Sequence, residues 1–325
     1  MQIAMMGGGA WGTTLAQVLA DNNHNVVIYD INTDFVKKIN EKHLHPFFDL
    51  KIPESIKATS NLKDALNDAS VVVLCVPTTY LRGVLKQINE YVDRKILFIN
   101  VSKGIEPESS KLVYELVDEE IQYEHNYATI SGPSHAEEVI ERNVTALVSA
   151  SFNPTYAKKA QELFANHKYL RVYTSNDVVG VEASGAIKNA FAIISGVAYG
   201  LGLKENARAL KEFVSIVTAL GGNIQTVYGL SGLGDLIVTA SSFNSRNFKC
   251  GINIAKGMSI EDAIKNVGQS VEGIRAIKAA YQIGIKYNLE LPMIDIAYKV
   301  ITNELSPSLA LEGLLSRQLK NERYW

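Results

Sequence analysis

A glycine-rich segment near the start of the chain has the spacing of a dinucleotide-binding site. Residues 7–12 read Gly-Gly-Gly-Ala-Trp-Gly, follow a short apolar run and open a predicted helix. In the pattern G-x-G-x-x-G, Gly7 would permit a tight turn, Gly9 would let the backbone approach a pyrophosphate, and Gly12 would let the helix pack against the strand. Free N–H groups at the helix N-terminus favour bound phosphate. We therefore expect a dinucleotide here rather than an ordinary glycine-rich turn.

Asp30 has the spacing of a residue that discriminates between NAD and NADP. It ends a predicted strand 18 residues after Gly12. A carboxylate at this position accepts hydrogen bonds from ribose hydroxyls and repels a 2′-phosphate. The next residues, Ile31 and Asn32, supply no cation for such a phosphate. The pattern favours NAD, with NADP as the alternative, unless Asp30 only caps the turn that follows it.

Polar residues in four further segments could take part in catalysis. Two of the segments follow predicted strands, and the carboxyl ends of parallel strands face the ligand crevice, so Lys103 could reach a substrate. A third places Lys188 on a helix of otherwise apolar and small residues. The segments are Asn100–Glu106, Ile130–Ala136, Val181–Asn189, and Gly232–Leu236 followed by Ser245-Arg246-Asn247.

The elements that must position these residues alternate between strand and helix in the first half of the chain. Short β-branched runs predict the strands and 3.6-residue periodicity predicts the helices. This order predicts an α/β fold, with a doubly wound (Rossmann) parallel-sheet domain over residues 1–177. The expected strands are Ile3–Met6, Val26–Tyr29, Val71–Val76, Ile96–Asn100, Tyr127–Ile130, Thr145–Ser149 and Leu170–Tyr173. The expected helices are Thr13–Asp21, Asp34–Glu41, Asn61–Ala69, Tyr80–Tyr91, Ser110–Val117 and Pro154–Ala165.

Strand signals fade after about residue 175. We therefore predict an all-α C-terminal domain over residues 178–325. Its expected helices are Val178–Leu201, Ala207–Leu220, Phe248–Lys256, Val271–Tyr287 and Ile294–Thr302.

Composition excludes several classes of function. Of the 325 residues, 47% are hydrophobic, which is ample for a core. The 32 basic and 34 acidic residues give a net charge of −2, so no overall basic field indicates nucleic-acid binding. The apolar stretch Asn189–Leu203 is short and interrupted by Gly and Ser, which argues against stable membrane insertion. Two cysteines favour a reducing cytoplasm, and the six histidines show no metal-ligand spacing.

Taken together, the motifs resemble the NAD(P)-dependent glycerol-3-phosphate dehydrogenases of bacterial type. The resemblance rests on the glycine fingerprint, the Lys188 helix, the Gly234-Asp235 turn, the Ser245-Arg246-Asn247 triplet and the Val271-Glu272-Gly273 segment, which occur in the family's order. It implies interconversion of sn-glycerol 3-phosphate and dihydroxyacetone phosphate, usually to supply phospholipid synthesis. It also implies a homodimer.

The resemblance assigns roles to residues of this chain position by position. Lys188 looks like the catalytic proton acceptor, and Lys103 like a lysine that contacts both cofactor and substrate. Many NADP-using members carry a basic residue at or beside the position of Ile31, and its absence here favours NAD. The remaining substrate positions match Gly132, Ser134, Asp235, Ser245, Arg246 and Asn247. The remaining cofactor positions match Ala10, Trp11, Ala136, Ser270 and Glu272, with Arg246 also touching the cofactor.

These residue types suit the oxidation of a secondary alcohol that bears a phosphate. Burial of Lys188 on an apolar helix beside a second cation such as Lys103 would lower its pKa toward neutrality. A guanidinium such as that of Arg246 donates two parallel hydrogen bonds to a phosphate, and a helix starting at Phe248 would add N–H groups. Asp235 could orient Lys188 or hold a substrate hydroxyl, and both roles stay open.

Other interpretations compete with this one. Taken singly, Lys188 could be a core-edge lysine, Asp235 a helix cap, and Glu272 a first-turn carboxylate. A β-hydroxyacid or ketopantoate-type dehydrogenase shares the architecture, although the phosphate-binding triplet around Arg246 argues against it. A sensor that binds NADH without turnover is a further alternative, which retention of Lys103, Lys188 and Asp235 disfavours.

Overall fold

The computed structural model describes residues 1–107, 109–203, 209–268, 270–316 and 318. The chain divides into two compact units. The first comprises Met1–Ala186 and Leu220–Asp235, and the second Ile187–Ala219 and Leu236–Trp325. The sequence places the boundary between a dinucleotide-binding domain and a helical domain at residue 177, and this boundary stays a prediction.

The first unit contains an eight-stranded sheet formed by the described residues, in the order β3-β2-β1-β4-β5-β6-β7-β8. The order reverses between β1 and β4, and ligands bind at such switch points outside the carboxyl ends of the strands. The strands are β1 Gln2–Met6, β2 Asn25–Tyr29, β3 Lys57–Thr59, β4 Val71–Leu74, β5 Ile96–Asn100, β6 His125–Ser131, β7 Thr145–Ala150 and β8 Leu170–Ser175.

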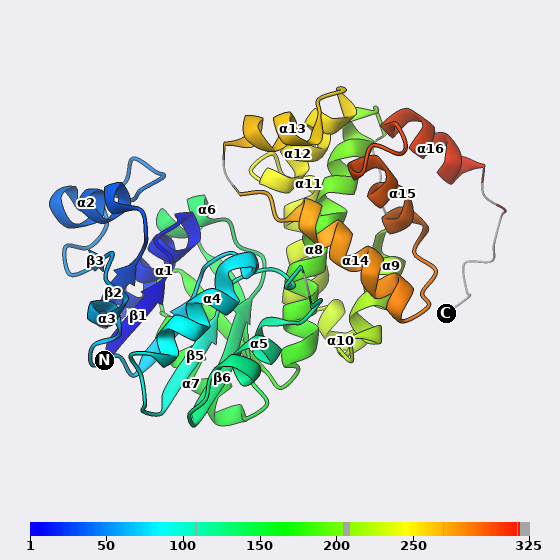
Figure 1. Ribbon diagram of the computed structural model, residues 1–325. Helices are drawn as coiled ribbons and strands as arrows, with labels where there is room; N and C mark the ends of the chain where they lie inside the picture. Colours follow the sequence, from blue (N-terminus) through cyan, green and yellow to red (C-terminus); the bar gives the residue numbers. More distant parts are fainter. Residues whose placement is uncertain (108, 204–208, 269, 317, 319–325) are drawn as a thin grey trace. The chain divides into compact units, whose positions relative to one another are not determined.

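Helices cover both faces of the sheet, as the doubly wound prediction requires (Figure 1). Apolar residues of α1, α6 and α7 pack on one face, and those of α3, α4 and α5 pack on the other. Strands between two layers need apolar residues on both sides, and every residue of β4 and β5 is buried. The helices are α1 Ala10–Asp21, α2 Thr33–Lys42, α3 Leu62–Leu66, α4 Thr78–Asn89, α5 Val113–Glu120, α6 Ala136–Ile140 and α7 Pro154–Phe164.

Several local features differ from the sequence expectations, among them helix α6, which was not predicted. Strand β7 pairs antiparallel with β6, so the sheet is not wholly parallel. Strand β3 was not predicted, because its three residues include only one that is buried. Helix α5 begins at Val113, three residues later than predicted. Ser110 cannot be helical because it has a positive φ of 57°, and Glu106 N donates a hydrogen bond to Lys111 O across this turn.

The rest of the described chain after β8 is helical, which confirms the predicted all-α character. The helices are α8 Val178–Gly200, α9 Ala209–Ala219, α10 Ile224–Val227, the π-helix η1 Leu230–Gly234, α11 Asp235–Ser241, α12 Arg246–Ala255, α13 Ile260–Val267, α14 Gly273–Lys286, α15 Pro292–Ile301 and α16 Pro307–Leu315. Of these, α10, η1, α11, α13 and α16 were not predicted. The predicted helix 207–220 corresponds to α9, and its first two residues lie outside the described residues.

Helix α8 is long and apolar enough to cross a membrane by length and composition alone, and no other helix of the described residues is. Its most apolar window is 89% buried, as in the core helix of a globular protein.

Two glycines let α8 and α12 pack backbone to backbone within the second unit. A Cβ on Gly196 would lie 2.1 Å from Phe248 O, and one on Gly251 would lie 2.2 Å from Ile193 O. Such distances are far below contact distance, so any side chain at either position would push the helices apart. This crossing fixes the start of α12 relative to the middle of α8.

Candidate active site

The glycine-rich loop joins β1 to α1 at the switch point of the sheet. Gly7 has φ of +106°, and a Cβ there would lie 2.7 Å from Cys75 O. A Cβ on Gly12 would lie 2.0 Å from Gly7 O, so the helix packs against the loop only because residue 12 is glycine. By contrast, no described atom lies within 4 Å of a Cβ built on Gly9. Packing within the fold explains Gly7 and Gly12, whereas the open space at Gly9 leaves room for a ligand.

The first turn of α1 fits a phosphate group. Gly9 is the N-cap and has no side chain to bond the N–H groups of Ala10, Trp11 and Gly12. These groups and the positive end of the helix dipole favour an anion. The buried indole N–H of Trp11 has no hydrogen-bond partner among the described residues. The loop therefore fits a bound dinucleotide.

Asp30 follows β2 and closes on the same loop. Its Oδ2 accepts a hydrogen bond of 2.6 Å from Gly8 N, and its Oδ1 accepts one of 2.8 Å from Asn32 N. The carboxylate thus caps its own turn and also holds the glycine-rich loop. Ile31 is 83% exposed, so an apolar, uncharged side chain stands next to this carboxylate.

Lys103 lies at the centre of a polar cluster in the first unit. Its Nζ is 3.1 Å from Asp235 Oδ2, 3.2 Å from Gly132 O and 6.0 Å from the ring centroid of Trp11. Asp235 is 1% exposed, so Lys103 supplies a countercharge to a buried carboxylate. Four residues that were predicted separately are therefore brought together by the fold.

The segment after β6 completes this cluster. Gly132 has φ of +143°, and a Cβ there would lie 3.1 Å from Leu147 Cα. Ser134 Oγ donates to Gly132 O at 3.2 Å, and Ala136 is the first residue of α6. The carbonyl of Gly132 therefore receives both Lys103 Nζ and Ser134 Oγ.

In the second unit, Lys188 is buried on α8 and its Nζ donates to Thr239 Oγ1 at 2.9 Å. Thr239 was not among the predicted site residues. One signal could have indicated it: Thr239 follows Asp235 by four residues on α11, the spacing of one helical turn.

The Ser245-Arg246-Asn247 triplet forms the start of α12. The helix begins at Arg246, two residues earlier than predicted, because Ser245 is its N-cap and its Oγ accepts from Phe248 N at 3.3 Å. Asn247 joins three elements: its Nδ2 donates to Asn189 Oδ1 at 2.9 Å, and its Oδ1 accepts from Gly273 N at 2.8 Å. Asn247 therefore fixes α12 to the residue after Lys188 and to the start of α14.

Arg246 also lies beside Ser270, which was predicted to contact the cofactor. Its Nη1 donates to Ser270 Oγ at 3.3 Å. Two residues further on, Glu272 Oε1 lies 3.6 Å from Arg275 Nη1. Burial raises the pKa of Glu272, although the nearby Arg275 and Arg246 oppose this shift. The second unit therefore places Arg246, Ser270 and Glu272 in one neighbourhood.

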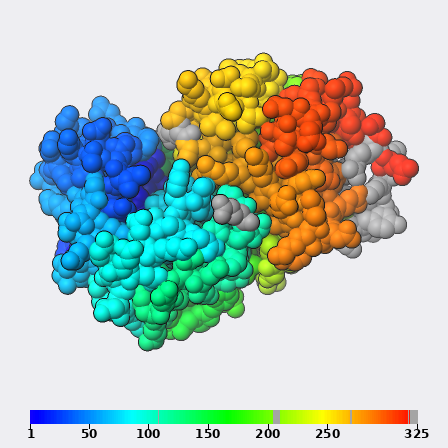
Figure 2. All heavy atoms as spheres, in the orientation of Figure 1, coloured from blue at the N-terminus to red at the C-terminus, as the bar shows by residue number. Residues whose placement is uncertain are grey.

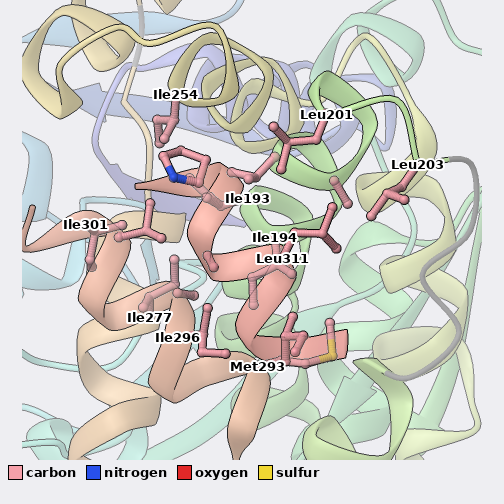
Figure 3. Close-up of a pocket in the computed structure, with 17 residues that line it drawn as sticks. Ile193, Ile194, Leu201, Leu203, Ile254, Ile277, Met293, Ile296, Ile301 and Leu311 are labelled. Atoms are coloured by element: carbon pink, nitrogen blue, oxygen red, sulfur yellow. The ribbon is translucent and has the colours of Figure 1, made fainter. Parts of the chain in front are cut away.

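A separate cavity of about 100 Å³ lies inside the second unit (Figure 3). Helix α16 lines it with Pro307, Ala310, Leu311 and Leu314, while the opposite face of α16 lies at the surface (Figure 2). Every described residue that lines this cavity is apolar. A phosphorylated substrate could make no hydrogen bond with these side chains, so the cavity is not its binding site.

The described residues contain no group of three or more His, Cys, Asp or Glu side chains that could hold a metal ion. The side chains described above offer amines, a guanidinium, hydroxyls and carboxylates.

Comparison with known proteins identifies the family. Residues 2–157 match the family described as NAD-dependent glycerol-3-phosphate dehydrogenase N-terminus, and residues 177–312 match the corresponding C-terminus. A glycerol-3-phosphate dehydrogenase [NAD(P)+] of Acholeplasma laidlawii is 51% identical over 330 residues, covering 99% of each chain. That of Bacillus subtilis is 39% identical over 99% of this chain and 96% of its own.

Solved structures agree with this result. The crystal structure of a glycerol-3-phosphate dehydrogenase from Coxiella burnetii superimposes with a TM-score of 0.90 at 31% identity, covering 97% of this chain and 98% of the other. The resemblance inferred from the motifs is thereby confirmed. The chain belongs to the NAD-dependent glycerol-3-phosphate dehydrogenase family.

Proposed function

We propose that the protein interconverts sn-glycerol 3-phosphate and dihydroxyacetone phosphate with NAD(H) or NADP(H). Family membership over the whole chain supports this reaction. The observation that carries it in the structure is the arrangement of the second unit, where Asn247 bonds to Asn189, the residue after Lys188. A cation suited to phosphate, Arg246, is thereby held in fixed relation to a buried amine, Lys188.

The first unit would hold the dinucleotide. The open space at Gly9 and the N–H groups that begin α1 would hold its pyrophosphate, and Asp30 its adenosine ribose. When bound, the nicotinamide accepts or donates the hydride. Asp30 and the uncharged Ile31 favour NAD over NADP, because neither neutralises a 2′-phosphate. Ala136, Ser270 and Glu272 are proposed as further cofactor contacts.

Lys188 would move the proton. In oxidation its amine takes the proton of the substrate hydroxyl, and in reduction its ammonium returns a proton to the developing alkoxide. Thr239 Oγ1 accepts one N–H of the amine and thereby limits its rotation. Lys188 is therefore the proposed proton acceptor.

Arg246 would bind the phosphate of the substrate. A guanidinium donates two parallel hydrogen bonds to a phosphate, and the N-terminus of α12 adds its dipole. Ser245 and Asn247 already bond within the protein, so we propose that they chiefly hold Arg246 in place, with their spare donors directed to the phosphate.

Lys103 would contact both substrate and cofactor, and the buried Asp235 would hold its ammonium in position. Gly132 and Ser134 are proposed to line the substrate site beside it. The sequence left open whether Asp235 orients Lys188 or holds a substrate hydroxyl, and both stay predictions. The ion pair with Lys103 adds a third role, because the same carboxylate orients the Lys103 ammonium.

Four broader properties belong to the same proposal. We expect a homodimer in the cytoplasm whose product, glycerol 3-phosphate, supplies phospholipid synthesis. We also expect the functional division of the chain to fall near residue 177, and the family match in two parts, which resumes at residue 177, supports this.

The phosphate site can be tested by comparing two ketone substrates. With dihydroxyacetone phosphate, Arg246→Ala should lower kcat/KM about 100-fold, because one charge-assisted bidentate contact is lost. With dihydroxyacetone, which lacks the phosphate, the same substitution should lower kcat/KM far less, because only the predicted contact of Arg246 with the cofactor is lost. Arg171→Ala, on the exposed side of β8, is the control and should affect neither substrate. If Arg246→Ala leaves the preference for the phosphorylated ketone intact, the proposed phosphate site is wrong.

A further inference from the structure

The described residues between β5 and α5, which include Lys103, form no regular secondary structure, yet hydrogen bonds fix several of them. Ser102, the residue before Lys103, donates its Oγ to Val76 O at 2.7 Å and to Leu74 O at 3.2 Å. Its backbone N donates to Asn100 Oδ1 at 2.9 Å. The position of Lys103 therefore depends on Asn100, the last residue of β5.

Asn100 in turn depends on a buried carboxylate. Its Nδ2 donates to Glu182 Oε1 at 3.1 Å, and Asn100 is 1% exposed. With Oδ1 bonded to Ser102 N, the amide has one orientation that satisfies both ends. The side chain of Asn100 therefore transmits the position of Glu182 to the residue next to Lys103.

Glu182 is the common acceptor of three donors from three elements. Besides Asn100 on β5, Tyr127 Oη on β6 donates to Oε1, and Tyr114 N in the first turn of α5 donates to Oε2 at 3.2 Å. Glu182 is 6% exposed. Burying a carboxylate is costly unless its oxygens are bonded, so these three donors fix Glu182 where it is.

The far end of the loop is anchored independently. Arg82 on α4 donates from Nε and Nη2 to the two carboxylate oxygens of Glu106, each at 2.8 Å. Thr78 Oγ1 donates to Ile105 O at 3.3 Å. Lys103 thus lies on a short span between two fixed ends, opposite Asp235 and the carbonyl of Gly132.

We propose that Glu182 is a positioning residue for Lys103, acting through Asn100 and Ser102 rather than by contact with substrate or cofactor. This inference rests on the proposed function, in which Lys103 contacts both ligands. It assigns a role in catalysis to Glu182 on α8, which lies in the predicted segment Val181–Asn189 but was given no role there.

A double-mutant cycle tests the proposal. Glu182→Gln keeps the size of the side chain but replaces one acceptor oxygen with an amide donor, so at least one of the three donors loses its acceptor. In the wild-type background we expect kcat/KM for dihydroxyacetone phosphate to fall about tenfold. In the Lys103→Ala background, the same substitution should change kcat/KM by less than about twofold, because there is no longer an amine to misplace.

A purely structural role gives a different result. If Glu182→Gln only reduced the fraction of folded protein, it would lower kcat/KM equally in both backgrounds, and that additivity would overturn the proposal. Asn100→Ala, put through the same cycle, is the second variant and should show the same coupling if Glu182→Gln does not fold.

The control is Glu212→Gln, at another buried carboxylate, whose oxygens accept from Met293 N and Ile294 N at the start of α15. It should lower stability without coupling to Lys103.

The cycle also separates this proposal from the proposed function. If Lys103→Ala alone leaves kcat/KM unchanged, the role of Lys103 in the proposed function is wrong, and the positioning role of Glu182 is wrong with it. If Lys103→Ala lowers kcat/KM but the Glu182 effect is additive, the proposed function stands and only the positioning role is wrong.

Discussion

Acidification should destabilise the first unit through His45. This side chain is completely buried, and its Nδ1 accepts hydrogen bonds from Phe47 N and Phe48 N, both at 3.1 Å. Its Nε2 lies 3.1 Å from the carbonyl oxygen of Ala10, the first residue of α1. Because Nδ1 is an acceptor, the neutral ring carries its proton on Nε2 and donates it to that carbonyl. A second proton on Nδ1 would break both backbone hydrogen bonds.

The size of the effect follows from the pKa of His45, which burial lowers from 6.5 to about 4. A folded-state pKa below the unfolded-state value means that the fold favours neutral imidazole. The contribution is therefore complete above pH 6.5 and is lost as the pH falls toward 4. Linkage between these two values gives a loss of about 2 kcal/mol at pH 5 and almost none at pH 7.5.

Urea unfolding of wild type and His45→Gln at pH 7.5 and pH 5 measures this loss. The unfolding free energy of the wild type should fall by about 2 kcal/mol more than that of the variant between the two pH values. His167→Gln, at an exposed histidine, controls for the loss of one imidazole. Equal pH dependence in wild type and His45→Gln would refute the reasoning, because His45 would then bind protons equally in both states.

Three further substitutions test other parts of the account. Lys188→Ala should lower turnover by about 10³-fold or more while NADH still binds, since the proton acceptor is lost but the dinucleotide site is not. Rapid kinetics measures the first effect and NADH titration the second. Near-wild-type turnover would count against the role of Lys188. Asp30→Ala should weaken NADH binding and reduce the discrimination against NADPH, because it removes a negative charge and the acceptor of the Gly8 N–H. An unchanged ratio of the NADH and NADPH dissociation constants would contradict this role of Asp30. Gly251→Ala should lower the unfolding free energy by about 1–3 kcal/mol, because the new Cβ would lie 2.2 Å from Ile193 O. If the variant were as stable as the wild type, the crossing of α8 and α12 would be looser than described.

The sequence was sufficient to predict the fold class because local patterns match their elements. The glycine spacing at residues 7–12 follows a strand and opens a helix, as the fingerprint requires. The apolar run at β4 is buried on both faces of the sheet. The direction of β7 could not be predicted, since an apolar run reads the same in parallel and antiparallel pairing.

Long-range partners were the part of the site that the sequence could not supply. Lys103 and Asp235 are 132 residues apart, and Lys188 and Thr239 are 51 apart, so only the folded chain pairs them. Glu182 lies in the predicted segment Val181–Asn189, but its own role could not be predicted, because that role depends on Asn100, 82 residues earlier. The residues that the resemblance assigned to substrate and cofactor stay predictions until they are mutated.

The most direct test of the central claim is the absorbance of the reduced cofactor at about 340 nm, followed with folded protein, dihydroxyacetone phosphate, and either NADH or NADPH. We predict a loss of absorbance that requires dihydroxyacetone phosphate and is faster with NADH than with NADPH. Absence of that loss with both cofactors would contradict the proposed reaction and direct attention to another keto substrate or to a dinucleotide sensor.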